Sequence, residues 1–403
     1  MIRRKEKNKT LTIMLVAIIA MFSAISPLQT FCATNEVVQI SEDLNSSVLD
    51  ELNQIDFSGF NEIVATFQES GTNIFALSNV KDKVYDIISG NNAISYSSLL
   101  ATIFSGIIDM FIRYLPILSI IVAIGVISNM LSGVKSKFNE KSTNDLINLV
   151  CLFAVVILII GAITSITSSV NKSVGNMVNQ MNITFPILLT LMIGLGAKAS
   201  VGVFQPIVAI LTTYVADFFS YFIVPLFMIS FVFGIISNIS TSVKLDKFNA
   251  FISSLFKWSV GLVFTLFFAV FTIQGISAGT FDSVSLRTTK YTIKSYVPVM
   301  GGYLADGMDL IMASTILIKN SVGLVGILLI ASTILSPLLE IIMFSLVLKL
   351  LSAILQPMGN SQISNFLSST SKSVTMLSSS ILAVGFMYLI SIGLIMTTSN
   401  VVV

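Results

Sequence analysis

Long apolar runs recur along this chain from Ser97 to Asn400, and they constrain its fold more than any other feature. A helix needs about 20 mostly apolar residues to cross a hydrocarbon core of roughly 30 Å, and several of these runs reach that length. Charged residues make up only 10% of the sequence, against roughly 25% in a typical soluble domain. Because a bilayer rather than water must solvate most of the surface, we expect an all-α, polytopic bundle of transmembrane helices.

We predict about seven membrane spans, with six to nine possible, over residues 114–131, 146–167, 183–197, 201–239, 259–278, 322–355 and 377–397. Two of these runs are ambiguous. The third holds only 15 residues and carries Pro186 near its start, so it is either a short span or a re-entrant helix. The sixth holds 34 residues, which is enough for two short crossings hinged at Pro337 and Glu340.

Residues 1–34 have the layout of a secretory signal peptide. A basic stretch up to Lys9 is followed by an apolar run, Leu11–Phe22, and then by polar residues and Pro27. We predict cleavage after Thr34, with an uncleaved signal anchor as the alternative.

Residues 35–98 form an acidic segment. It contains ten Asp and Glu residues, the first at position 36, and its only basic residues are Lys81 and Lys83. Apolar residues recur at helical spacing, which predicts short amphipathic helices. The segment is either a solvated spacer or a docking surface, and residues 99–403 form the membrane domain.

The loop after the first span carries Lys135, Lys137 and Lys141, so the positive-inside rule places it in the cytoplasm. Residues 35–98 are then extracytoplasmic, which agrees with the export signal. The later loops do not decide on which side the C-terminus lies.

The composition argues against enzymatic chemistry. The chain has no histidine and two cysteines, Cys32 and Cys151, and it lacks phosphate-loop, dinucleotide and zinc-peptidase motifs. We therefore expect no catalytic residue, no cofactor and no metal ion, and no nucleic acid among its partners.

A few charged residues lie in or beside apolar runs. Asp109 and Arg113 are four residues apart, so they share a helix face and can pair. Asp217 and Glu340 interrupt apolar stretches, where a charge costs roughly 2.5–3.5 kcal/mol at the bilayer centre. Such groups usually face a bundle interior, a partner or water, unless they lie at a helix end. For Glu340 we predict a buried role, because apolar residues flank it on both sides.

Small residues are spaced along several spans, among them Gly323, Gly326, Gly385 and Gly393. Small residues let helices approach closely inside a membrane, so they predict a packed bundle or an oligomer.

The stretch 285–327 is unusual for a membrane protein. Its notable positions are Arg287, Lys290 and Tyr291, then Pro298 and Gly301, then Lys319, Asn320, Gly323 and Gly326. The basic residues beside a span end suit lipid headgroups or an acidic partner. The apolar spacing of residues 308–315 favours an interfacial or re-entrant helix, and an ordinary connecting loop is the alternative.

These motifs, with Gln356, Pro357 and Gly359 further along, resemble the stage III sporulation protein AE family of endospore-forming bacteria. The resemblance is strongest over residues 185–403, whereas the N-terminal part matches in layout only.

The resemblance implies a permease-like, polytopic part of a channel complex in the mother cell membrane that faces the forespore. Its implied partners are ring-building proteins, a secretion-type ATPase and a forespore membrane protein, and its implied role is to support late forespore development. The resemblance supplies no catalytic residue.

The alternative function is a stand-alone small-molecule transporter. Its support is a weak internal echo, in which residues 198–202 resemble 319–323 and residues 249–254 resemble 364–369. Transporter folds often contain such repeats, although sequences rich in Ser, Gly and Val also match by chance.

Overall fold

The computed structural model describes residues 42–69, 79–90, 96–133, 141–239, 245–296 and 300–398, and these ranges are helical almost throughout. The elements are α2 (Glu42–Gln54), α3 (Ser58–Glu69), α4 (Val80–Ile88), α5 (Tyr96–Gly133), α6 (Lys141–Gly194), α7 (Lys198–Phe218), the π-helical η1 (Phe219–Ile223), α8 (Val224–Ile239), α9 (Asp246–Tyr296), α10 (Gly301–Leu355) and α11 (Ser361–Thr398). The all-α prediction is confirmed for these residues, and the predicted signal peptide lies outside them.

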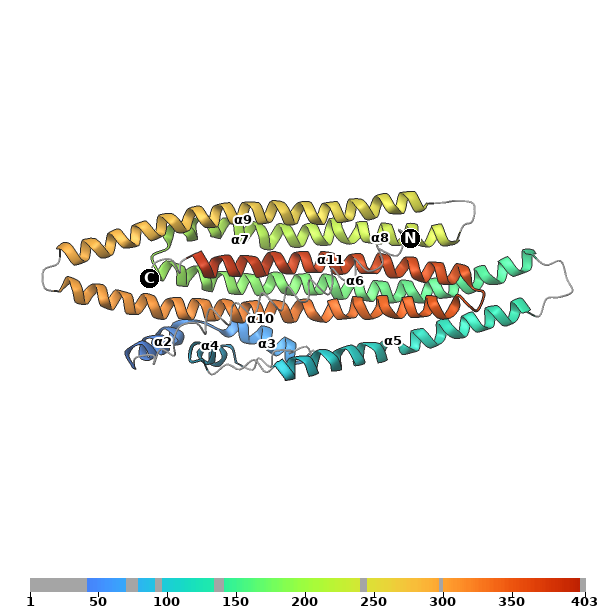
Figure 1. Ribbon diagram of the computed structural model, residues 1–403, viewed down its shortest axis with the longest axis horizontal. Helices are drawn as coiled ribbons and strands as arrows, with labels where there is room; N and C mark the ends of the chain where they lie inside the picture. The colour runs from blue at the N-terminus through green and yellow to red at the C-terminus, as the bar shows by residue number, and fades with distance from the viewer. Residues whose placement is uncertain are drawn as a thin grey trace, which may run out of the picture.

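The long helices run side by side along one axis and form an elongated bundle (Figure 1). Six of the described helical segments are long and apolar enough to cross a membrane: residues 101–131, 146–194, 198–238, 247–273, 302–355 and 361–398. This number lies at the lower end of the predicted range.

Two predicted spans, 146–167 and 183–197, belong to one helix, so the short or re-entrant third span is wrong. The residues between these runs are polar on one face only. The opposite face carries Val170, Val174, Met177 and Met181, which are fully buried in the bundle. That spacing of four, three and four residues is helical, so the helix continues through the polar run.

The predicted hinge at Pro337 is also wrong, because α10 continues from Gly301 to Leu355 with Pro337 inside it. Proline is tolerated within membrane helices where neighbouring groups satisfy the backbone. The run 201–239 is likewise one helical rod, in which the five-residue π-helical turn η1 joins α7 to α8.

Several of these helices are much longer than one membrane crossing requires. With 54 residues in α6 and 55 in α10, each measures about 80 Å at 1.5 Å per residue. A hydrocarbon core is roughly 30 Å thick. Part of the bundle must therefore project beyond the membrane.

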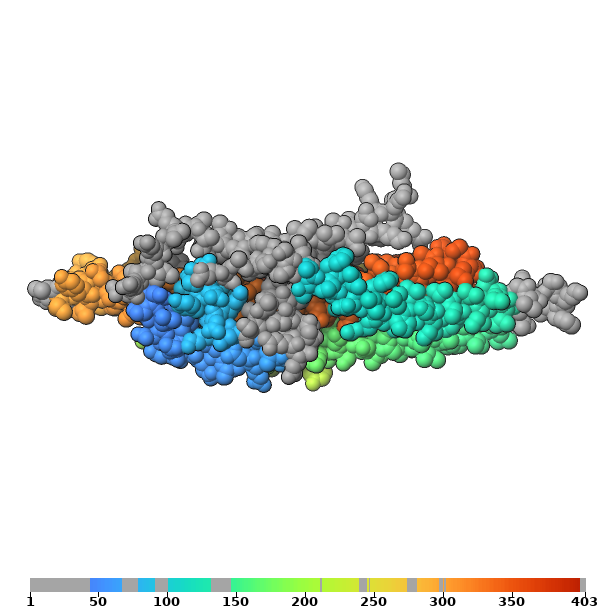
Figure 2. All heavy atoms as spheres, turned by 90° about the horizontal axis from the view of Figure 1, so that it is seen from below, coloured from blue at the N-terminus to red at the C-terminus, as the bar shows by residue number. Residues whose placement is uncertain are grey.

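The acidic N-terminal segment packs on this bundle. Its helices α2 to α4 bury apolar side chains that include Val48, Leu52, Phe60 and Val84, and they contact α10 and α6. In Figure 2, α2 to α4 and then α5 follow one another along one face of the bundle, and part of α6 is visible next to α5. A freely solvated spacer is therefore excluded for residues 42–69 and 79–90.

Candidate functional site: polar contacts of the helical bundle

The stretch singled out in the sequence forms a helical hairpin. Arg287, Lys290 and Tyr291 lie in the last turns of α9, Gly301 begins α10, and Pro298 between them lies outside the described residues. The prediction of a separate interfacial helix, a re-entrant element or an ordinary connecting loop for residues 308–315 is wrong, because these residues belong to α10. Both arms are regular helix, and residues 301–315 form the first turns of α10.

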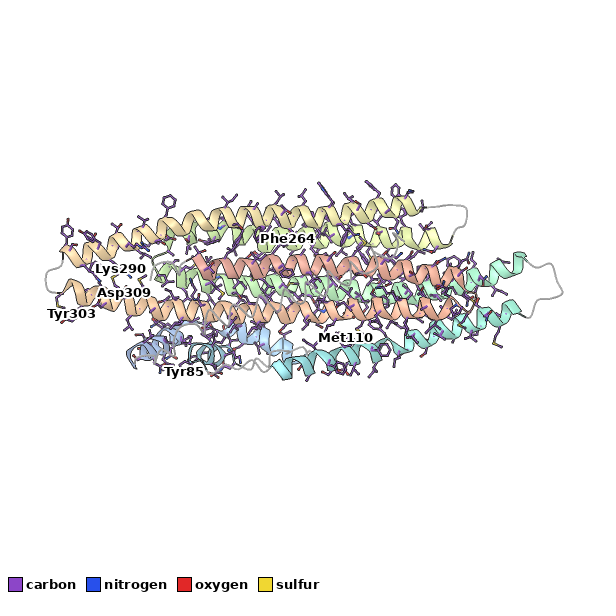
Figure 3. All side chains as sticks on the ribbon, in the orientation of Figure 1. Tyr85, Met110, Phe264, Lys290, Tyr303 and Asp309 are labelled. Carbon is purple, nitrogen blue, oxygen red and sulfur yellow. The ribbon has the colours of Figure 1, made fainter. Side chains whose placement is uncertain are left out.

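An ion pair joins the two arms of this hairpin. Lys290 of α9 contacts Asp309 of α10 at one end of the bundle, as Figure 3 shows. Exposed ion pairs contribute little stability, typically about 0.2–1 kcal/mol. The pair therefore orients the hairpin more than it stabilises the bundle.

A buried carboxylate caps the start of α7, and no motif in the sequence indicates it. Both oxygens of Asp282, which comes from α9, accept backbone hydrogen bonds, from Ala199 N at 2.9 Å and from Ser200 N at 2.8 Å. These N–H groups belong to the first turn of α7, where no partner exists within the helix. A negative charge is also favourable at a helix N-terminus. The contact thus fixes the depth of α9 relative to α7.

Lys319, in the first half of α10, is fully buried, which the motif around it did not indicate. The neighbouring Asn320 is half-buried, and its Oδ1 has no hydrogen-bond partner. In the sequence echo, Lys319 corresponds to Lys198, which is exposed at the first residue of α7. The two matching lysines therefore occupy unlike environments.

Other buried polar groups follow Lys319 along α10. About two helical turns further on, Gly326 packs on Thr184 of α6, and about four turns further on, Thr333 accepts a 2.6 Å hydrogen bond from Gln180. Thr184 Oγ1 and Gln180 Oε1 lack partners. The bundle interior along α10 therefore holds buried polar groups at several levels.

Three glycines allow the close approach of α10 to its neighbours. A side chain at Gly323 would overlap Met396, and one at Gly385 would overlap Ile334. A Cβ on Gly326 would lie 2.9 Å from Thr184 Cγ2. Gly393, in contrast, has open space around it.

Serines at a seven-residue spacing join α10 to α11. Ser352 and Ser364 each donate to the other's carbonyl, at 2.9 and 2.8 Å, and Ser345 and Ser371 lie 2.9 Å apart through their hydroxyls. A seven-residue repeat keeps such residues on one seam of two antiparallel helices. We call these four residues the serine seam. Serines are frequent along both helices, so the sequence alone does not single out these four.

The motif Gln356–Pro357–Gly359 forms the turn between α10 and α11. Gly359 adopts a φ of +83°, a conformation that other residues rarely take. The next residue, Asn360, is buried and donates from Nδ2 to Gly125 O of α5 at 2.8 Å. The turn therefore anchors α5 as well as reversing the chain.

The charged residues in apolar runs have different surroundings. Asp109 and Arg113 are both exposed on α5 and do not form an ion pair, and Asp217 is exposed on α7. Glu340 is half-buried, and its Oε1 accepts a long 3.4 Å hydrogen bond from the Tyr114 hydroxyl. Glu340 thus lies at the boundary between α10 and α5.

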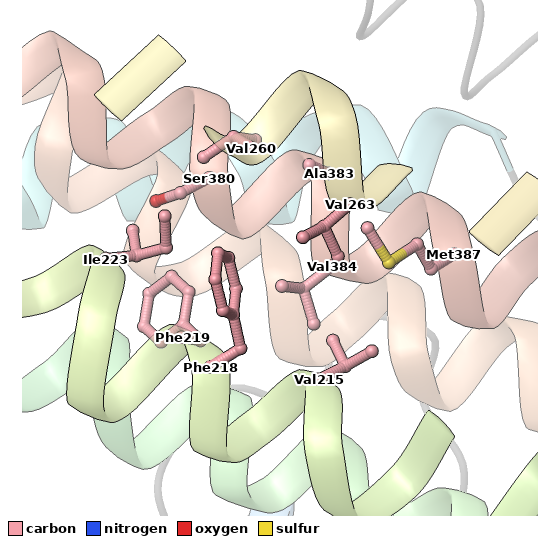
Figure 4. Close-up of a pocket in the computed structure, with 10 residues that line it drawn as sticks. All are labelled: Val215, Phe218, Phe219, Ile223, Val260, Val263, Ser380, Ala383, Val384 and Met387. Carbon is pink, nitrogen blue, oxygen red and sulfur yellow. The ribbon is translucent and has the colours of Figure 1, made fainter. Parts of the chain in front are cut away.

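A small apolar cavity adjoins the π-helical turn. It has a volume of about 20 Å³ and is lined by Phe219 and Ile223 of η1, together with residues of α7, α9 and α11 such as Val215, Val260 and Val384 (Figure 4). A drug-sized ligand site usually has about 300–1,000 Å³. This cavity therefore does not provide a site for a small-molecule substrate.

The sequence profile described as Stage III sporulation protein AE (spore_III_AE) matches residues 78–399, which extend from α4 to the end of α11. This chain belongs to that family. The chain is also 22% identical over 320 residues to the stage III sporulation protein AE of Bacillus subtilis (strain 168), which covers 79% of this chain and 80% of the relative. The predicted family is thus confirmed, and the protein is a multi-pass sporulation membrane protein. No solved structure matches.

Proposed function

We propose that this protein is a membrane component of the channel or secretion-like complex that links mother cell and forespore. In this role it supports late forespore development and sits in the mother cell membrane that faces the forespore. The observation that carries the proposal is the family match over residues 78–399. The ring-building proteins, the secretion-type ATPase and a forespore membrane protein are the proposed partners.

The shape of the bundle is compatible with such a role. Helices of about 80 Å leave a large part of their length outside a bilayer, where it is accessible to other proteins. The exposed Tyr291 and Tyr296, with the basic residues of the same helix end, offer a surface for an acidic partner. Small-molecule transport would instead call for a substrate cavity.

Deletion and copurification test this proposal. A clean deletion should permit engulfment and block later forespore development, and an affinity-tagged copy should bring the other complex components with it during sporulation. Normal spore formation by the deletion strain would contradict the role. Saturable uptake of a small molecule by the purified protein in liposomes would favour the stand-alone transporter.

The proposed orientation has its own test. Single cysteines at Ser47 and Ser136, in a chain that lacks Cys32 and Cys151, should differ in labelling by an impermeant thiol reagent. Ser47, in α2, should react from outside the cell, whereas Ser136 should not. Equal labelling in intact cells would overturn the assignment of residues 35–98 as extracytoplasmic.

A further inference from the structure

The acidic segment and the tip of the α9–α10 hairpin lie at the same end of the bundle. Glu51 of α2 accepts hydrogen bonds of 3.0 and 3.1 Å from Thr315, in the first third of α10. Lys290, near the end of α9, contacts Asp309 of α10. The predicted span 322–355 of α10 lies beyond both contacts. Whichever side of the membrane holds α2, the hairpin tip therefore lies on that side too.

Two other parts of the chain reach this end. Asp282 of α9 caps the start of α7, so the reversal from α6 to α7 lies beside the last third of α9. Gly323 of α10 packs on Met396, so α11 ends beside the first half of α10. The end of α6 and the end of α11 therefore lie on the side of the acidic segment.

The remaining reversals lie at the opposite end of the bundle. Ser128, near the end of α5, donates a 3.0 Å hydrogen bond to Asn148, near the start of α6. Asn360, in the turn after α10, donates to the Gly125 carbonyl of α5. The helix α9 is antiparallel to α10 and similar in length, with 51 against 55 residues, so α9 begins beside the end of α10. Figure 1 shows the start of α9 and the hairpin tip at opposite ends of the molecule.

Lysines mark this opposite end. The sequence between α5 and α6 contains Lys135 and Lys137, and α6 begins at Lys141. Lys244 precedes α9, and Lys247 is the second residue of that helix. The positive-inside rule assigns the first group to the cytoplasm, but the sequence alone does not connect the second group to it. Because the structure brings both groups to one end, they support the same orientation.

The hairpin tip carries an exposed surface that is aromatic and weakly basic. This part of α9 lies outside the apolar run of that helix, 247–273. Arg287 and Lys294 are exposed, and three tyrosines are 71%, 80% and 76% exposed, namely Tyr291, Tyr296 and Tyr303. Tyrosine and arginine are enriched in protein–protein interfaces. Anionic lipids instead attract clusters of about four to eight basic residues. With three basic and two acidic residues between positions 287 and 309, the tip favours a protein partner.

We propose that the tip of the α9–α10 hairpin is a docking surface outside the cytoplasm, and that its partner is an acidic protein surface on that side. Carboxylates of the partner face Arg287 and Lys294, and the tyrosines supply the apolar contact area. The secretion-type ATPase does not reach this surface, because ATP is a cytoplasmic substrate. The inference deepens the proposed function and rests on it for the orientation of residues 35–98.

Cysteine labelling tests the side of the membrane. In the full-length chain with Cys32→Ser and Cys151→Ala, a single cysteine replaces Ser295 at the hairpin tip or Lys247 at the start of α9, and both positions are exposed. The chain is expressed in non-sporulating cells, so that its outer side faces the medium. An impermeant thiol reagent should label Ser295→Cys in intact cells as it labels Ser47→Cys. Lys247→Cys should react only after the cells are permeabilised.

The outcomes separate this inference from the proposed orientation. Labelling of Ser47→Cys but not Ser295→Cys in intact cells, with both reactive after permeabilisation, would overturn the inference and leave the orientation of α2 intact. Labelling of both only after permeabilisation would overturn the orientation, and the outer docking surface with it, while the shared side of α2 and the hairpin would stand.

Charge reversal tests the partner. Arg287→Glu combined with Lys294→Glu should abolish copurification of the ring-building proteins or the forespore membrane protein during sporulation, and the ATPase should be retained. The matched control, Lys172→Glu with Lys372→Glu at exposed positions away from the tip, should retain all partners. Both variants should accumulate to the parental level.

A second variant leaves the charges unchanged. Tyr303→Ser, on the other arm of the hairpin, should weaken the same copurification. Unchanged copurification from both tip variants, or loss of the ATPase alone, would overturn the docking surface. Loss of only a second, differently tagged copy of the chain would replace the acidic partner with self-association and overturn the proposal.

Discussion

Two helices with the same hydropathy occupy opposite positions in this protein. The most apolar 18-residue windows of α5 and α10 both have a mean hydropathy of 2.3, yet 17% of the α5 window is buried and 94% of the α10 window is buried. Hydropathy measures how strongly a segment avoids water. Because lipid and a protein interior both exclude water, hydropathy does not distinguish a lipid-facing helix from a central one. Close packing and polar contacts must therefore select the central helix.

The contacts that make α10 central are specific. Glycines on α10 and α11 let the two helices approach, and the serine seam joins them by hydrogen bonds. The helices α5 and α9 instead expose large apolar side chains such as Ile112 and Leu266. Matched substitutions should therefore have large effects in the centre and small effects on the periphery.

The largest expected effect is at Gly385. Leucine at this position would overlap Ile334, so Gly385→Leu should destabilise the bundle by about 3 kcal/mol or more and reduce its accumulation in membranes. Gly261→Leu on α9, where open space surrounds the glycine, is the control and should accumulate normally. Thermal unfolding in detergent measures both, and equal melting temperatures would break the comparison.

Glu340 tests the boundary between the central and the peripheral helix. Leucine removes both the charge and the acceptor for the Tyr114 hydroxyl, so Glu340→Leu should abolish sporulation while the protein still accumulates. Glu340→Gln keeps the shape and the hydrogen bond, and it should give an intermediate spore yield. Parental spore yield from the leucine variant, at normal protein level, would reject a buried role.

Asp282 is a buried carboxylate on the peripheral helix α9. Asp282→Ala leaves two backbone N–H groups of α7 without partners, which should cost about 1–3 kcal/mol. The exposed Asp306, on the adjacent hairpin arm, is the control, and Asp306→Ala should change the unfolding temperature little. If the two variants unfold alike, the cap does not position α9.

The serine seam should contribute a smaller coupling. A double-mutant cycle of Ser352→Ala and Ser364→Ala should give an interaction free energy of about 0.6 kcal/mol, the average for hydrogen bonds between membrane helices. The same cycle at Ser119 and Ser254, on separate peripheral helices, should give none. A zero coupling at the seam would leave glycine packing as the sole determinant of the α10–α11 contact.

The smallest expected effect concerns the packing of α2 on α10. The Glu51 carboxylate accepts hydrogen bonds from Thr315 Oγ1 at 3.0 and 3.1 Å. Burial raises the pKa of Glu51 above its ordinary value, against the opposing effect of hydrogen bonds from Thr315 and Ser314. A raised carboxyl pKa means that the packed state favours the protonated form. The packing should therefore be tightest below the ordinary pKa of glutamate and should weaken as the pH rises through the raised value.

Hydrogen exchange of the α2 amides in the purified protein measures this pH dependence. Glu51→Gln should remove it, because the amide keeps the hydrogen-bond acceptor and does not titrate. A pH dependence that persists in the glutamine variant would assign it to another group.

The amino-acid sequence by itself determined that the chain is a helical membrane protein of this family. Apolar runs of membrane-spanning length and the motifs from Arg287 to Gly359 were sufficient, because both are local properties of the chain. The helices α2 to α4 also followed from local spacing. The continuity of α6 was detectable too, since Val170, Val174, Met177 and Met181 mark a buried face within a run that was interpreted only as polar.

Only the tertiary structure decided which apolar helix is central, that Lys319 is buried and that Asp282 caps α7. Each of these depends on contacts between residues far apart in sequence, and lipid and protein interiors select the same apolar side chains.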